Sequence, residues 1–253
     1  MTERDENVKT VSEFGRELGL VEHLTELRSR IIRSLIYVTV GTVAGWCLLY
    51  PAFFKALSEP VALYLSKHGG SFLITGVADG FFIKMQMSVL IGIMLAFPLI
   101  SWEGWAFVSP GLTREEKKGL WLVAPLSILL FVGGVAAGYW VLPAGINWLA
   151  EQNPPGAVYM PSVQQTVTFI LKMCLAFGLA FQMPVVLMFL AKVGIINSAL
   201  MKKYWRQAVV GISIVAAVIT PSNDWFSMTM MCIPMIVLYA LSIGLVRAIE
   251  RRR

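Results

Sequence analysis

Charged residues are scarce in this sequence of 253 residues. Only 14% of the residues are charged, whereas 57% are hydrophobic and the mean hydropathy is +0.70. Soluble globular domains carry about 25% charged residues, so this composition argues against an ordinary soluble domain. It favours a membrane protein, in which the long uncharged stretches are spans.

Cysteine and histidine are also scarce. The three cysteines, at 47, 174 and 232, are odd in number and have no paired spacing, which argues against a disulfide framework or a zinc site. The two histidines, His23 and His68, fall on opposite sides of the membrane in the topology below, so they cannot form a metal pair or a triad. We expect no metal, no cofactor and no catalytic residue, and read the cysteines as small core residues.

Six uncharged stretches are long enough to hold a transmembrane helix, which needs roughly 17 to 25 residues. They are 34–54, 85–102, 119–150, 173–191, 207–223 and 225–246. The third is too long, and its prolines indicate a helix end within 142–148. The fourth span should begin near Thr166, after a proline-rich outer loop. The predicted fold class is therefore all-α, a polytopic membrane protein with six transmembrane helices.

The positive charges indicate an orientation. Of the 21 Lys and Arg residues, seventeen fall in segments that would share one side of the membrane. These segments are the region before 34, the loops 103–118 and 192–206, and the end from 247. The loops of the other side hold only Lys55 and Lys67. Because short cytoplasmic loops hold the excess of positive charge, we expect both termini to be cytoplasmic.

No linker or internal repeat divides the chain. We expect one helical membrane domain over residues 20–250, preceded by a charged N-terminal tail, residues 1–19, that need not be ordered. The fifth span is short, about 24 Å from Trp205 to Thr220, against a hydrocarbon core of about 30 Å. Prolines inside the spans should kink them, which predicts a concave bundle. These prolines are Pro98, Pro125, Pro184 and Pro234.

Two charged segments on the cytoplasmic side carry the candidate chemistry. In "EHLTELRSRI", apolar residues recur at helical spacing, and Glu26 and Arg30 lie four apart on the opposite face. In "WAFVSPGLTREEKK", the adjacent Glu115 and Glu116 open a helix. A solvated face or simple capping would explain either segment alone. Together, two carboxylates on one side of the membrane could receive a dication.

Four motifs along the chain resemble the TatC family, the six-span receptor subunits of the twin-arginine protein translocase. They are "HLTELRSRI" before the first span, "WAFVSPGLTREEKK" after the second, "LAFGLAFQMPVV" in the fourth, and "ITPSNDWFSM" with the following "IPM" at the last hairpin. The resemblance runs from about residue 20 to 247. It implies a protein of the inner membrane that binds the paired arginines of signal peptides on folded preproteins at its cytoplasmic face.

The resemblance implies a recognition site at Glu26 and Glu116, and Glu115 stays an alternative to its neighbour. Arginine's planar guanidinium bonds carboxylate oxygens bidentately, a geometry that lysine cannot reproduce, so two such sites would select two arginines. Other positions of the site could equally well pack the helix junction or bind lipid phosphate. They are His23, Leu27, Arg28, Trp105, Phe107 and Pro110, with Pro60 in the first outer loop.

Three polar positions in the second half of the chain are candidate partner-binding residues. Gln182 lies where the family usually carries a membrane-embedded glutamate, so either a functional role or a structural hydrogen bond is open to it. Thr220 and Asp224 lie in the turn between the last two spans, where Asp224 should cap the sixth span.

A bundle of this size offers no sealed pore for folded cargo, so transport should need further subunits. The resemblance implies single-span TatA/TatB-type subunits in grooves along spans four to six, further copies of this chain, and energy from the proton-motive force. We expect the lipid bilayer as surroundings and no nucleic acid partner.

Two other functions would require features that this sequence does not show. A small secondary transporter using Gln182, Lys172 and Lys84 would need an inverted repeat or interrupted helices, and the sequence indicates neither. An intramembrane hydrolase would need a nucleophile and a base within the spans, and no such arrangement stands out.

Overall fold

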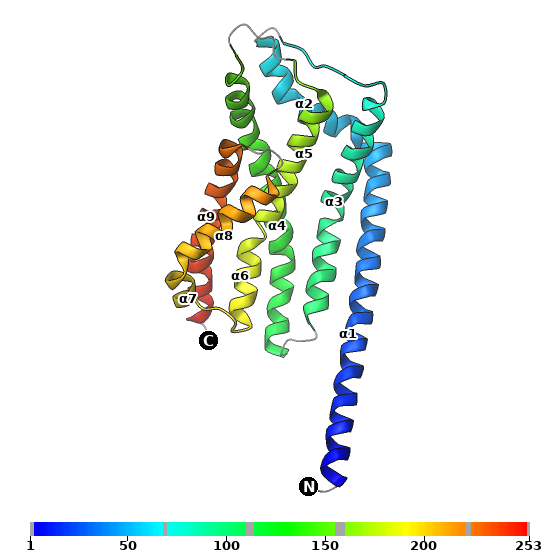
Figure 1. Ribbon diagram of the computed structural model, residues 1–253, viewed down its shortest axis with the longest axis vertical. Helices are drawn as coiled ribbons and strands as arrows, with labels where there is room; N and C mark the ends of the chain where they lie inside the picture. The colour runs from blue at the N-terminus through cyan, green and yellow to red at the C-terminus, as the bar shows by residue number, and fades with distance from the viewer. Residues whose placement is uncertain (1–2, 68–69, 110–113, 155–159, 221–223, 252–253) are drawn as a thin grey trace.

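The chain forms helices along almost all of its described length (Figure 1). The computed structural model describes residues 3–67, 70–109, 114–154, 160–220 and 224–251, with the backbone only at 3–21, 67, 114–123 and 249. His68, Pro110 and Pro155 lie outside these residues. The helices are α1 (Glu3–Ala44), the π-helical η1 (Gly45–Leu49), α2 (Tyr50–Lys67), α3 (Asp79–Val108), α4 (Arg114–Glu151), α5 (Val163–Ala180), α6 (Met183–Lys192), α7 (Ser198–Lys203), α8 (Trp205–Ile219) and α9 (Trp225–Glu250). The predicted all-α class is confirmed.

Five segments are long and apolar enough to cross a membrane, and they correspond to five of the six predicted spans. The remaining span is α8, whose 15 residues measure about 22 Å at 1.5 Å per residue. Figure 1 shows that α8 and α9 meet well below the upper end of α4. The predicted short fifth span is therefore confirmed.

The start of α1 and the end of α9 lie at the same end of the bundle (Figure 1). α1 packs on α3, α3 and α4 pack on α5, and α6 and α8 pack on α9. After η1 the chain turns, and α2 lies at the opposite end of the molecule from the N-terminus. Since α1 begins at Glu3, the segment 3–19 continues the helix of the first span. Its separation as a tail stays a prediction.

The fourth span is broken, whereas the sequence predicted one helix kinked by its proline. α5 ends at Ala180, Phe181 and Gln182 form a turn, and α6 then begins at Met183 with Pro184 in its first turn. Proline lacks an N–H and fits the first turn of a helix, where that N–H would have no partner within the helix. The break turns the backbone at the position of Gln182.

α4 is longer than predicted. It runs through Pro143 and ends at Glu151, so the expected end within 142–148 is wrong. Transmembrane helices tolerate an internal proline because neighbouring groups satisfy the freed carbonyl. The added turn places Trp148 against the start of α9, where its ring stacks on Phe226 at 4.3 Å between centroids. This contact braces the α8–α9 hairpin against α4.

α5 is the central helix of the core. Ten of its 18 residues are buried, among them Val167, Ile170 and Phe177, which lie three and seven positions apart on one helical face. Cys174 on the same helix is buried, as the sequence predicted, but Cys47 is exposed and does not belong to the core.

Two glycines let α1 and α3 approach closely. A Cβ added at Gly41 would lie 2.7 Å from the carbonyl oxygen of Gly92, and one added at Gly92 would lie 2.5 Å from the backbone nitrogen of Thr42. Both distances are too short for real carbon contacts, so the two backbones themselves form this interface. Small residues commonly permit such contacts between membrane helices.

Gly92→Ala should therefore destabilise the protein by about 1–3 kcal/mol, because the methyl group meets the backbone of α1. The matched control is Gly133→Ala on α4, where an added Cβ has nothing within 4 Å. There the better helix propensity of alanine should leave stability unchanged or raised. Heating both variants in detergent and measuring the fraction that stays monodisperse checks the prediction; equal midpoints would contradict it.

Candidate functional site

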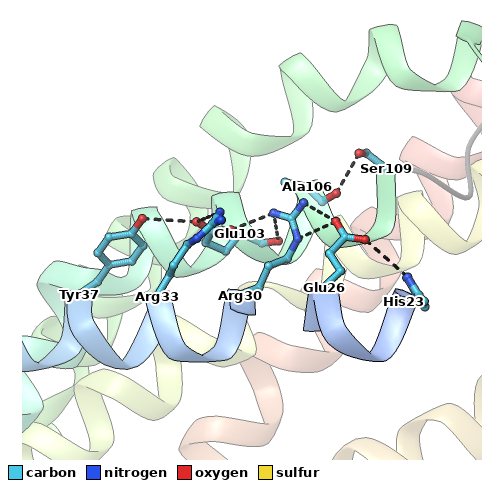
Figure 2. Close-up of polar contacts among 8 residues, drawn as sticks. All are labelled: His23, Glu26, Arg30, Arg33, Tyr37, Glu103, Ala106 and Ser109. Carbon is cyan, nitrogen blue, oxygen red and sulfur yellow. Dashed lines mark hydrogen bonds and ion pairs between the residues drawn. The ribbon is translucent and has the colours of Figure 1, made fainter. Parts of the chain in front are cut away.

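Arg30 lies between two carboxylates, one on its own helix and one on α3 (Figure 2). Its Nε and Nη2 donate to Oε1 of Glu26 at 3.0 and 2.6 Å, and its Nη1 donates to Oε2 of Glu103 at 2.8 Å. The other oxygen of Glu103 accepts from the Tyr37 hydroxyl at 3.3 Å and lies 3.7 Å from Nη1 of Arg33. One guanidinium thus joins α1 to α3.

Exposure rises along this network from α3 toward solvent. The side chain of Glu103 is 9% exposed, that of Arg30 is 19% exposed, and that of Glu26 is 33% exposed. A carboxylate as buried as Glu103 is costly unless it is paired and hydrogen-bonded, and here two arginines and a tyrosine meet that need. Glu26 is the carboxylate of the network that an incoming ligand can reach.

Three further predicted residues surround Glu26. The His23 ring stacks on Phe107 at 4.3 Å between centroids, and its Nδ1 lies 3.7 Å from Oε2 of Glu26. Leu27 and Phe107 line a groove of about 340 Å³ between α1 and α3, whose wall also includes Arg30 and Glu103. The structure therefore brings two of the sequence motifs together around one carboxylate.

Other predicted residues lie apart from this cluster. Trp105 points to the other side of α3, where its Nε1 donates to Oγ of Ser127 at 3.2 Å and its ring meets Phe189 edge-on. It packs the helix junction, as the alternative interpretation had it. Arg28 is exposed. Pro60 lies inside α2, at the opposite end of the molecule from the N-terminus (Figure 1).

The second predicted carboxylate lies where only the backbone is described. Glu115 and Glu116 fall in the first turn of α4, which starts beside the end of α3 (Figure 1). Pro110 lies outside the described residues. The role of Glu116 as the second carboxylate, with Glu115 as the alternative, stays a prediction.

Glu103 and Tyr37 were missing from the predicted site. A carboxylate in an otherwise apolar helix end was a usable signal, because such a charge needs a partner. Its partner, however, is 73 positions away in the sequence. Among the described residues, no group of three or more His, Cys, Asp and Glu could hold a metal ion.

Gln182 occupies a second, separate place in the fold. Its Nε2 donates to the backbone carbonyl of Ser127 at 3.0 Å, which ties the broken fourth span to α4. It also lines an apolar groove of about 450 Å³, bounded by α5 and α6 on one side and α8 and α9 on the other. On α8, an atom added at the Cβ position of Gly211 would have nothing within 4 Å. The groove is open at this point.

Thr220 and Asp224 hold the hairpin that forms one wall of this groove. The buried Thr220 hydroxyl donates to the carbonyl of Ala216, at the end of α8. Oδ1 of Asp224 accepts from the backbone N–H of Ser227 at 2.6 Å, which is the predicted cap of the sixth span.

Hydrogen bonds also hold α7, the short helix before α8, against α9. Glu250 accepts hydrogen bonds from the backbone N–H of Ser198 at 2.7 Å and from its hydroxyl, and these bonds hold the pKa of Glu250 below its usual range. The Tyr239 hydroxyl donates to the carbonyl of Met201 at 3.0 Å. Both contacts fix α7, and with it the start of α8, against α9.

The chain is similar to known proteins over most of its length. The family model described as Sec-independent protein translocase protein (TatC) matches residues 22–234. The TatC protein of Desulforapulum autotrophicum is 38% identical over 223 residues, which cover 88% of this chain and 82% of that protein. The TatCy protein of Bacillus subtilis is 33% identical over 242 residues, or 93% and 91% of the two chains.

A solved structure supports the same family. The crystal structure of a twin-arginine translocase receptor, TatC, superposes with a TM-score of 0.76 at 31% identity, covering 89% of this chain and 98% of that one. These matches confirm the family that the four motifs predicted. The chain belongs to the TatC family of Sec-independent protein translocase proteins.

Proposed function

We propose that this protein is the signal-peptide receptor and core subunit of a twin-arginine translocase, and that it binds the paired arginines of folded preproteins at the cytoplasmic face of the inner membrane. The observation that carries the proposal is the guanidinium seated on Glu26, with two nitrogens of Arg30 at 2.6 and 3.0 Å from Oε1. A carboxylate that holds one guanidinium at the protein surface has the charge and geometry to hold another. A similar solved protein is named a twin-arginine translocase receptor.

A second carboxylate would bind the second arginine of the pair. We assign Glu116 to this role, with Glu115 as the alternative. α4 begins directly after α3, so its first turn lies at the same end of the bundle as the Glu26 network (Figure 1). Two carboxylates on different helices would select two guanidinium groups at a fixed separation.

The apolar groove beside Glu26 supports the same proposal. Signal peptides place basic residues before an apolar core. The groove runs from Leu27 along α1 to Val38, with Ile100 of α3 on its other side. A peptide with its arginine on Glu26 would meet this apolar surface next.

Charge supports a topology for the proposed receptor. The first residues of α1 and the last of α9 lie at one end of the bundle, and the excess of Lys and Arg favours a cytoplasmic location for that end. As a translocase component the protein has a transport role; we propose that it performs no covalent chemistry and that the proton-motive force drives export.

Glu26→Gln should lower photocrosslinking of a paired-arginine peptide to a probe at Leu24, which is 63% exposed and lies two residues before Glu26. A charge-assisted hydrogen bond contributes about 1.5–3 kcal/mol, so the loss should be roughly tenfold or more in affinity. Glu22→Gln, an exposed carboxylate one turn earlier on α1, is the matched control and should bind like the wild type.

A paired-lysine peptide supplies the second comparison. It should crosslink weakly to the wild type, and equal crosslinking of the two peptides would remove the receptor proposal. Comparing Glu116→Gln with Glu115→Gln in the same assay identifies the second carboxylate, because only the contacting residue should matter.

We further propose that single-span TatA/TatB-type subunits dock in the groove between α5–α6 and α8–α9, and that several copies of the chain share one complex. α6 and α8 both pack on α9, so the side chains between them face an open apolar groove. Gln182 supplies a polar group at its wall, where a second helix could pair with it in the absence of water.

Gly211→Trp should fill this groove and reduce copurification of the single-span subunit, because the indole ring would occupy the space of the docking helix. Val218→Trp on the same helix is the control; Val218 is 79% exposed and does not line the groove. Copurification that is lost with both variants, or with neither, would place the partner elsewhere.

A further inference from the structure

We propose that Glu103 is a positioning residue for signal-peptide binding, because it receives Arg30 when an incoming arginine takes Glu26. In this exchange Arg30 starts shared between Glu26 and Glu103 and ends paired with Glu103. The inference rests on the proposed receptor function and adds the step by which its occupied site becomes available.

The contacts of Arg30 divide into two separable sets (Figure 2). Nε and Nη2 donate to Glu26, whereas Nη1 donates to Oε2 of Glu103 at 2.8 Å and reaches its backbone carbonyl at 3.5 Å. Different nitrogens therefore serve the two carboxylates. The contacts with Glu26 can break while those with Glu103 remain.

The burial of Arg30 explains why Glu103 is needed for the exchange. The Arg30 side chain is only 19% exposed, so its release from Glu26 would leave a largely buried cation if no other anion were near. Glu103 removes that cost, since it already contacts the same guanidinium. The incoming arginine then replaces the ion pair between Arg30 and Glu26 with its own ion pair to Glu26, which is more exposed than Glu103.

Glu103 is itself held in place for this role. Its Oε1 accepts from the Tyr37 hydroxyl at 3.3 Å and lies 3.7 Å from Nη1 of Arg33, which leaves Oε2 directed at Arg30. Arg33 is 55% exposed, so water can solvate it while Glu103 carries Arg30. The carboxylate is fixed before any ligand arrives.

The test measures the affinity of a fluorescent paired-arginine peptide for the full-length protein in lipid nanodiscs. Glu103→Gln should weaken binding about tenfold, because Arg30 then has Glu26 as its remaining carboxylate and competes with the peptide. Adding Arg30→Gln to this variant should restore affinity to within about threefold of the wild type, since the competitor is gone. Glu151→Gln, an exposed carboxylate at the far end of α4, is the matched control.

Rescue separates this role from a structural one. If Glu103 only fastened α1 to α3, removing Arg30 as well would not restore binding, and that result would overturn the exchange. Arg30→Gln alone should bind the peptide more tightly than the wild type, which keeps the proposal testable if Glu103→Gln fails to insert. Weaker binding by Arg30→Gln would likewise overturn it.

The wild type also tells the two proposals apart. If it does not distinguish paired arginines from paired lysines, the receptor function fails and the exchange fails with it. If it does distinguish them but Arg30→Gln neither rescues Glu103→Gln nor binds more tightly, only the exchange is wrong.

Discussion

A carboxylate at the edge of a hydrocarbon layer has to be neutralised, because an unpaired charge there costs several kcal/mol. Glu103 lies in the last turns of α3, a helix long and apolar enough to cross a membrane, and the side chains that neutralise it come from α1. The long first helix is therefore held against α3 by ion pairs near one end and by the backbone contact of Gly41 with Gly92 further along. With two fixed points, α1 cannot slide, and Glu26 has a defined position relative to the end of α3.

The second half of the chain is built around a different constraint. The break at Gln182 and the short α8 leave an apolar groove open between α6 and α8, which both pack on α9. Hydrogen bonds at both ends of the hairpin, from Ser227 to Asp224 and from Ser198 to Glu250, keep this open arrangement in place. The groove and the Glu26 network therefore lie on different helices, and both can be occupied at once.

Much of this architecture could be predicted from the sequence, because hydropathy and charge bias depend on local composition. The spans, the short fifth span and the cap at Asp224 are of this kind. The continuation of α4 through Pro143 and the break at Gln182 could not be predicted, because a proline can either kink or end a helix and tertiary packing decides between them. The i,i+4 pair of Glu26 and Arg30 was visible in the sequence, but the contact with Glu103 depends on how α1 and α3 pack.

The contact between Arg30 and Glu103 changes the interpretation of the "EHLTELRSRI" segment. Glu26 is an occupied site, so in the proposed receptor an arginine of a signal peptide would have to exchange with Arg30. The most direct test is a structure of the full-length protein with a paired-arginine peptide bound. The account predicts a peptide guanidinium on Glu26 and Arg30 on Glu103 alone. A complex in which Arg30 still holds Glu26 while the peptide is bound elsewhere would contradict it.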